Sequence, residues 1–464
     1  MKNILNLIDW LNQSIIPFIC VSLAFAIFFV FWDVIKAWKK RQLQDLKKAF
    51  PKNAHGIIFG KKGLHLIYSP ESSEEHVLCC AATGKGKTSS IGIPTLRSWK
   101  GTSYTIDLSS DICRNCPDVP HKLVYEPEDP DTTPYNIFGA IDALSDADDK
   151  NEALEQLAFL LMPEPPNMND NARFFLVNGR KILTASLISF YWNNMDFIKI
   201  CEKIVSSSWQ ELFSAIDATQ NRLGMMYISS FLDASAVNTA GCKQACDDAI
   251  MLFATNKKIK RSIRRPVNNE IAIEPKKLEK HNLFIVIEED KLALYSPLMN
   301  ILTSQVMQYI ATRKVTPESP TILLFLDEFG SLRLDAELVL DAVRRFRKRK
   351  CRIMLLMQNT VDMDILYGND TTRAILANLY FKVLLGGLCE SRSQLYFAEL
   401  LGHKETKSHS VSSNSTQTTR TESDSKDWVI APEDFDKQGK DNLILIAPNE
   451  ANGYLKLKKN YYFK

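Results

Sequence analysis

Strong net charge is missing from this sequence, because its 57 basic and 54 acidic side chains leave a formal charge of only +3. The overall balance therefore does not by itself indicate a nucleic-acid partner. Internal repeats are also missing. The ten cysteines include a Cys113-x-x-Cys116 pair, but no second such pair and no matched histidine pair. This pattern favours free thiols of a reducing cytosol over a disulfide framework or a tetrathiolate zinc site.

The charge that is present gathers in runs. Basic residues concentrate at 36–62, 257–265 and 344–352, and acidic residues at 126–155. Such runs are usually solvated faces, so each one is only a weak indicator of a polyanion.

The N-terminal region contains an uncharged apolar run, Ile15 to Trp32, of 18 residues. This is near the lower limit for crossing a bilayer as a helix. A cleaved signal peptide is the alternative, but only Lys2 is basic before the run and no small-x-small cleavage site follows. Basic residues after the run place that side in the cytoplasm. We predict a single-pass anchor in the inner (cytoplasmic) membrane, spanning about 15–32 within a membrane segment 1–50, with a large cytoplasmic domain behind it.

A candidate phosphate-binding loop (P-loop) lies between Glu75 and Ser90. A short apolar strand, Val77 to Cys80, leads into a small flexible loop closed by Lys87-Thr88. Backbone N–H groups and a helix N-terminus in such a loop cradle phosphates, the lysine reaches the outer ones, and the hydroxyl holds Mg²⁺. An alanine stands where the first glycine is expected, so a glycine-rich turn with chance lysines remains an alternative. The predicted nucleotide-contacting residues are Ala81, Ala82, Thr83, Gly84, Lys85, Gly86, Lys87, Thr88 and Ser89.

The alternation of apolar strands and helical connections predicts an α/β fold with a parallel-type central sheet. We expect a nucleotide-binding domain in two parts, 51–148 and 267–464. Between them, apolar residues recur at helical spacing over 149–266 with almost no strand-like alternation, which predicts an inserted all-α domain. Residues 404–426 are rich in serine and threonine and are expected to form a flexible loop.

Two further strands end in polar side chains that suit a P-loop. The strand Thr321 to Leu326 is followed by Asp327-Glu328, and the strand Arg352 to Met357 by Gln358. Asp327 would bind Mg²⁺ together with Thr88, Glu328 would activate the attacking water, and Gln358 would sense the γ-phosphate. A strand that simply meets a solvated turn is the alternative at both places. ATP and Mg²⁺ are thus the predicted cofactors, and ATP hydrolysis is the predicted reaction.

Two basic runs lie beyond the P-loop. Residues 344–352 form either a solvated helix end or the source of an arginine finger for the next subunit of a ring. The run at 257–265 is a candidate for sequence-independent contacts with DNA phosphates. The residues expected to make those contacts are Lys257, Lys258, Lys260, Arg261, Arg264 and Arg265.

The chain resembles the type IV secretion coupling proteins of the TraG/TraD kind, which are membrane-anchored ring ATPases of conjugation. The resemblance extends over most of the chain, from the anchor and P-loop to the closing segment. Its motifs are Ile93-Pro94-Thr95-Leu96, the strand into Asp107, Pro134-Tyr-Asn-Ile137, the helical insertion, Leu326-Asp-Glu-Phe-Gly330, Met357-Gln-Asn359, Asn378 and Leu400-Leu-Gly402. The sequence departs from the family at Ala81, after Asp107 and in having one predicted span instead of two.

The resemblance implies a RecA-like P-loop motor of the FtsK/HerA class, hexameric when active, that moves DNA with its attached relaxase into a secretion channel. It implies relaxosome proteins, channel components and single-stranded or duplex DNA as partners. An arginine eleven residues before the strand-end glutamine acts across the subunit interface in the family. Arg347 holds that spacing, with Arg345 and Arg349 close by. The alternatives are a DNA partition or packaging translocase and a docking receptor that does not hydrolyse ATP.

Overall fold

The computed structural model describes residues 31–36, 56–70, 75–164, 168–388, 390–414, 417–448 and 453–463. Most of the predicted membrane span, residues 15–30, lies outside these ranges, and Phe31 and Trp32 belong to a short described helix at 31–36. Within the described ranges, no helix combines the length and apolar character needed to cross a membrane.

Seven parallel strands form the centre of the molecule, in the order β9-β3-β8-β7-β4-β6-β5. They are β3 (Val77–Cys80), β4 (Thr102–Asp107), β5 (Lys122–Tyr125), β6 (Asn282–Val286), β7 (Ile322–Leu326), β8 (Cys351–Met357) and β9 (Phe381–Leu384). Every residue of β3 is buried, with Leu78 and Cys80 in one apolar core and Val77 and Cys79 in the other. Burial on both faces is why these segments are almost continuously apolar.

Four antiparallel strands extend the sheet beyond β9. They are β12 (Asn442–Ile446), β13 (Tyr454–Lys458), β1 (Ile58–Lys62) and β2 (His65–Tyr68). The complete sheet has 11 strands and is mixed, so the predicted parallel sheet is correct for the centre and wrong for this edge. The reason is that β1–β2 and β12–β13 are hairpins, whose short turns permit only antiparallel pairing.

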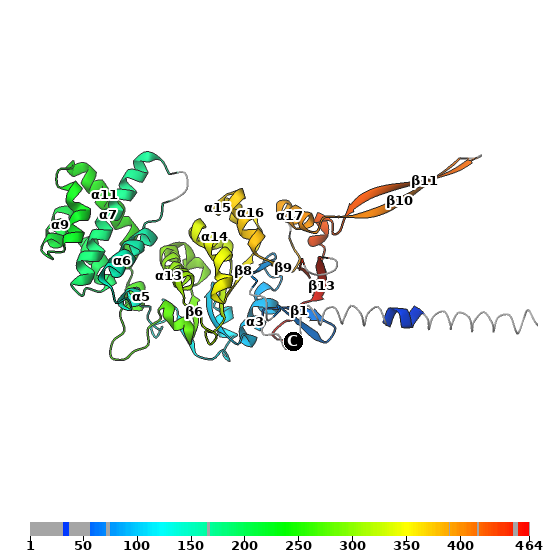
Figure 1. The fold of residues 1–464 in the computed structure, drawn as a ribbon, viewed down its shortest axis with the longest axis horizontal. Coiled ribbons are helices and arrows are strands. Elements are labelled where there is room, and N and C mark those ends of the chain that lie inside the picture. The colour runs from blue at the N-terminus through cyan, green and yellow to red at the C-terminus, as the bar shows by residue number, and fades with distance from the viewer. Residues whose placement is uncertain are drawn as a thin grey trace, which may run out of the picture.

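Helices cover both faces of the sheet (Figure 1). The helix after the P-loop continues past Gly92, because η2 runs directly into α3 and Pro94 occupies the first turn of α3, where its missing N–H costs nothing. The helical elements of this part are η2 (Thr88–Gly92), α3 (Ile93–Ser98), α4 (Asp111–Arg114), η4 (Pro275–Glu279), η5 (Glu289–Lys291), α13 (Leu292–Thr312), η6 (Phe329–Ser331), α14 (Ala336–Arg345), η7 (Phe346–Arg349), α15 (Val361–Tyr367), α16 (Asn369–Asn378), α17 (Ser391–Leu401) and η8 (Pro432–Phe435).

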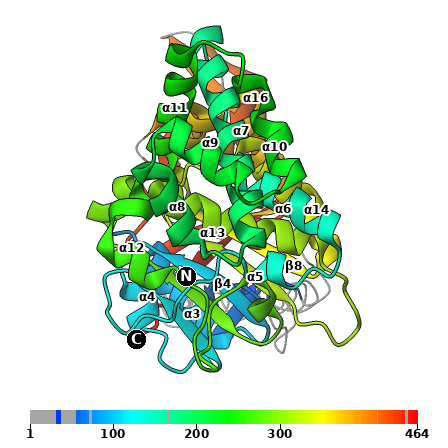
Figure 2. The ribbon, with the colours of Figure 1, turned by 90° about the vertical axis from the view of Figure 1, so that its left-hand side faces the viewer.

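A group of helices stands at one end of the molecule, beyond β5 and β6 (Figures 1 and 2). Side-chain caps start several of them, including a complete capping box between Ser208 and Glu211 at the start of α9. These helices are α5 (Gly139–Asp142), α6 (Ala147–Leu161), α7 (Asp170–Trp192), α8 (Phe197–Ser206), α9 (Trp209–Asp217), α10 (Arg222–Ile228), η3 (Ser229–Phe231), α11 (Ala236–Thr255) and α12 (Lys257–Ser262). The long helix α7 packs against α6, α10 and α11, so it forms the axis of the group.

The serine- and threonine-rich segment forms a hairpin instead of the expected loop. Its strands are β10 (His403–Asn414) and β11 (Gln417–Trp428), paired in antiparallel register from His403↔Trp428 to Asn414↔Gln417. The scarcity of apolar residues indicated a loop, but backbone pairing does not need an apolar face, and threonine favours extended backbone. The hairpin projects away from the sheet (Figure 1).

Candidate active site

The carboxyl ends of the parallel strands bring distant parts of the chain together. In the register of the sheet, Cys80 lies beside Met357, and Leu326 beside Leu355. The residues that follow these strands are therefore neighbours in space. This is the edge at which open α/β sheets bind their ligands.

The backbone of the P-loop is left-handed at two of its glycines. Gly84 and Gly86 have φ of +73° and +88°, which favours glycine at both positions. Ala81 is not among the residues with positive φ, and its N–H donates to the Met357 carbonyl at 3.1 Å. The alanine in place of the first glycine is thus compatible with this loop, because its backbone is in an ordinary conformation.

Lys87 lies under the loop and is only 5% exposed. Its Nζ donates to the Ala81 carbonyl at 2.8 Å and pairs with Glu328 Oε1 at 3.4 Å. Lys85, two residues earlier, is exposed. The structure therefore separates the two P-loop lysines by burial, and Lys87 is the one directed at the strand-end carboxylates.

Glu328 and Gln358 face each other across the ends of β7 and β8. Gln358 Nε2 lies 3.5 Å from Glu328 Oε2. Glu328 has a left-handed backbone with φ of 44°. Non-glycine residues in this conformation cost free energy and concentrate at functional sites. The two predicted catalytic side chains therefore lie together at this edge of the sheet.

Asp327 is a buried carboxylate with unused hydrogen-bonding capacity. It is 4% exposed, and its Oδ1 has no hydrogen-bond partner. Burial, and then the negative charges of Glu328 and Asp107, raise the pKa of Asp327 to about 7. A hard divalent cation compensates such a site, and Mg²⁺ in nucleotide enzymes often takes only one or two protein ligands. Asp327 fits Mg²⁺ on these grounds, and the other predicted ligand, Thr88, is the first residue of the helix after the P-loop.

Removing the Asp327 charge is expected to change the pH dependence of stability. Because the pKa of this carboxyl is higher in the folded than in the unfolded chain, the stability it contributes below about pH 4 is lost as pH rises through about 7. In metal-free buffer at pH 8, Asp327→Asn should therefore raise the free energy of unfolding, by at most about 4 kcal/mol. Urea denaturation at pH 5 and pH 8 measures this. The exposed Asp131→Asn is the control, and equal pH dependence of Asp327→Asn and the wild type would contradict the assignment.

Two residues at this edge are absent from the predicted set. Asp107 ends β4, is fully buried, and accepts hydrogen bonds from the Cys113 and Ser109 N–H groups at 2.7 and 3.2 Å. Its position at a strand end was visible in the sequence. Lys459 donates from Nζ to the Lys85 carbonyl at 2.8 Å. No motif marks Lys459, because only the folding of the last strands brings it to the P-loop.

Arg347 lies at the opposite end of the strands from the P-loop. It belongs to η7, which precedes β8, and its guanidinium pairs with Glu75 Oε1 at 2.8 Å. The seven residues of β8 span roughly 20 Å, so Arg347 is far from the P-loop of its own chain. Arg345 pairs with Asp341 at 3.3 Å, and Arg349 donates to the Arg313 carbonyl at 2.9 Å.

The basic run on and after α12 is largely paired with carboxylates. Lys258 pairs with Glu128, Lys260 with Glu202, and Arg264 with Glu270. Arg265 pairs with Asp142 at 3.0 Å, and Arg261 donates to the Pro127 carbonyl at 3.2 Å. The contacts of Lys258 and Arg261 join α12 to the segment that follows β5. Lys257 and Arg261 are exposed, and no ion pair with a carboxylate is described for either of them.

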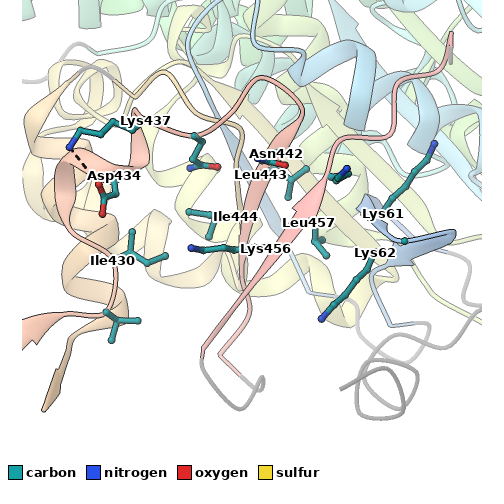
Figure 3. Close-up of a pocket in the computed structure, with 14 residues that line it drawn as sticks. Lys61, Lys62, Ile430, Asp434, Lys437, Asn442, Leu443, Ile444, Lys456 and Leu457 are labelled. Carbon is teal, nitrogen blue, oxygen red and sulfur yellow. Dashed lines mark ion pairs between the residues drawn. The ribbon is translucent and has the colours of Figure 1, made fainter. Parts of the chain in front are cut away.

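A separate cavity of about 710 Å³ lies at the antiparallel edge of the sheet (Figure 3). Its lining includes Lys61 and Lys62 of β1, Lys456 of β13, and an ion pair between Lys437 and Asp434 at 3.6 Å. None of its lining residues belongs to the P-loop or to the ends of the parallel strands. It is therefore distinct from the candidate active site.

Solved structures with the same fold include coupling proteins of conjugation. The unbound coupling protein TrwBΔN70 is 18% identical over 90% of each chain, with a TM-score of 0.69. TrwB in complex with ADP and Mg²⁺ is also 18% identical, over 90% of this chain and 92% of that one, with a TM-score of 0.68. VirB4 of Thermoanaerobacter pseudethanolicus is 12% identical over 89% and 98%, with a TM-score of 0.52. No curated protein matches the sequence significantly.

The sequence identities to these solved structures are too low to assign a family, but a match to a family model does assign one. The model described as "Type IV secretory system Conjugative DNA transfer" matches residues 33–464. The match includes the P-loop, the helical group and both strand-end carboxylates. This chain therefore belongs to the conjugative DNA transfer family of type IV secretory systems.

Proposed function

We propose that this protein is an ATP-hydrolysing motor that drives DNA, with its attached relaxase, into a type IV secretion channel. One observation carries the proposal: Lys87, Asp327, Glu328 and Gln358 converge on the P-loop edge of the sheet from three separate parts of the chain. The solved relatives support it, because TrwB has been described with ADP and Mg²⁺ and with an ATP analogue that cannot be hydrolysed.

The residues have distinct roles in this proposal. Arriving phosphates replace the Ala81 carbonyl as the partner of Lys87, which neutralises their charge. The same step releases Glu328 from Lys87, so that its carboxylate is free to orient and deprotonate a water molecule. Gln358 holds that water against the phosphate. Thr88 and Asp327 would hold Mg²⁺, which would neutralise charge at the phosphate oxygens.

The proposal extends to an assembly at the membrane. Residues 15–32 would anchor the chain in the inner membrane with the motor in the cytoplasm. Because Arg347 lies at the far end of β8 from its own P-loop, it is available to a neighbouring subunit's nucleotide, which requires a ring such as the family's hexamer. The helical group at the end of the molecule would receive the relaxase–DNA substrate.

ATP hydrolysis is expected to increase when DNA is added, and the increase should depend on salt. Contacts with phosphates release counterions, so stimulation should fall by a factor of ten or more between about 50 and 200 mM salt. The measurement is the ATPase rate of the purified protein with and without DNA at each salt concentration. The DNA-free rate corrects for salt effects on the motor itself.

Lys257 and Arg261, the two residues of the basic run for which no ion pair is described, provide the variant that tests these contacts. Lys257→Ala combined with Arg261→Ala should weaken stimulation and leave the DNA-free rate unchanged. Lys276→Ala, an exposed lysine of η4, is the matched control. Stimulation that is indifferent to salt, or equally sensitive to both variants, would count against these contacts. Absence of any ATP hydrolysis would count against the proposed function.

A further inference from the structure

The segment after β13 crosses the P-loop and is fixed there by hydrogen bonds. The Lys459 N–H donates to the Asp441 carbonyl at 2.8 Å, and its Nζ donates to the Lys85 carbonyl at 2.8 Å. Three residues later, the Tyr462 N–H donates to the Ser89 carbonyl at 3.1 Å. The segment is therefore held both on the loop and on the first turn of the following helix.

The contact between this segment and the P-loop is close. A Cβ atom built on Gly86 would lie 3.1 Å from Tyr461 Cε1, so the tyrosine ring approaches the glycine backbone directly. Lys459 is 5% exposed, because the loop covers it. Burial, and then the charge of Lys85, lower the pKa of Lys459 to about 8. Burying the charge of a lysine costs free energy, so we infer that its hydrogen bond to the Lys85 carbonyl helps to hold the segment on the loop.

The segment lies on the side of the P-loop toward which the ribose and base of a bound nucleotide point. In such loops the lysine and hydroxyl contact the outer phosphates and the metal, while the helix N-terminus receives the inner ones. Lys87 and Thr88 therefore mark the outer phosphate side, facing Glu328. The ribose and base of a bound nucleotide would extend in the opposite sense, past Ser89, whose carbonyl accepts the Tyr462 N–H.

Three consecutive aromatic side chains lie at this place. The ring of Phe463 is 5.3 Å from that of Tyr461, at 30°, and 5.1 Å from that of Tyr462, at 84°. Phe463 is nevertheless 60% exposed, so the two tyrosines support a ring with a free face. An exposed phenylalanine supported in this way is a stacking platform for a nucleobase.

We propose that Tyr461, Tyr462 and Phe463 form the base-binding wall of the nucleotide site, with the base stacked on Phe463 and the wall anchored to the P-loop by Lys459. The inference rests on the proposed function, because it names the base contact of the same site. Stacking uses the flat face that every nucleobase has, so the wall selects for the presence of a base rather than for one particular base.

The test compares a ligand with a base to one without. Phe463→Ala in the full chain should lower the affinity for ATP in the presence of Mg²⁺ by roughly 5- to 100-fold. Its affinity for inorganic tripolyphosphate should change less than about twofold, since that ligand contacts the P-loop alone. Phe463→Trp should retain the wild-type affinity for ATP. Titration calorimetry measures all of these affinities.

Controls separate this inference from the proposed function. Phe174→Ala removes an aromatic side chain of similar exposure from α7 and should change neither affinity. Wild-type ATP affinity in Phe463→Ala, or an equal loss for both ligands, would overturn the base-binding wall while leaving the motor assignment intact. If the wild type binds tripolyphosphate and ATP equally well, the wall is also overturned. If it binds neither, the nucleotide site itself is refuted.

Discussion

Replacing Lys87 with alanine is expected to lower the rate of ATP hydrolysis by at least about 100-fold, because the site loses the buried positive charge that faces the transferred phosphate. The affinity for ATP should fall as well, since the lysine contacts phosphate in the ground state. Steady-state ATPase rates and nucleotide affinities of the purified variant check both effects. The variant should still fold, which circular dichroism and thermal unfolding can verify.

Two other variants make this result specific. Lys85→Ala removes the exposed lysine of the same loop and should retain most of the activity. Glu328→Gln should abolish hydrolysis but retain ATP binding, because it removes the proposed general base and leaves the phosphate contacts in place. Substantial ATP turnover by Lys87→Ala, or equal effects of the two lysine substitutions, would refute the P-loop assignment.

Replacing Arg347 with alanine should lower ATP hydrolysis by about 1,000-fold in the assembled ring, with little change in ATP affinity. The physical reason is position, because η7 lies at the end of β8 remote from its own P-loop, so that in the proposed ring its arginine would act on a neighbouring subunit. In the isolated chain Arg347 pairs with Glu75, so this ion pair must open when the neighbour's nucleotide binds.

A mixing experiment tests whether Arg347 acts between subunits. Arg347→Ala retains an intact P-loop, and Lys87→Ala retains an intact arginine. Mixed rings should therefore recover part of the activity that each variant lacks alone. Arg344→Ala, an exposed neighbour on α14, is the control and should be active by itself. Failure of the mixture to recover, or a larger loss with Arg345→Ala or Arg349→Ala, would contradict the assignment to Arg347.

Local sequence predicted most of the secondary structure because the signals were strong and short in range. The apolar run before Asp327 became β7, as expected, and Asp335, a residue type favoured at helix starts, caps α14 through the Leu338 N–H. Helical spacing indicated the helices between α6 and α12. The family prediction is confirmed by the match over residues 33–464.

The failures all concern strand pairing, which leaves little trace in the sequence of either partner. Nothing in the sequence indicated that β13 pairs with β1, about four hundred residues earlier, or that the central sheet gains an antiparallel edge. The hairpin of β10 and β11 was expected to be a loop because its residues are polar. Composition reports the apolar surface available for burial, but hydrogen bonding between backbones requires none.

The sequence by itself determined the chemistry of this protein: a P-loop with a lysine and a hydroxyl, a strand ending in two carboxylates, and a glutamine on another strand. Those groups are specified by residue type and local spacing. The tertiary structure decided which groups meet. It buried Lys87 and exposed Lys85, brought Asp107 and Lys459 to the site, and placed Arg347 far from its own P-loop. Strand order and register set these distances, and both depend on contacts that no single segment encodes.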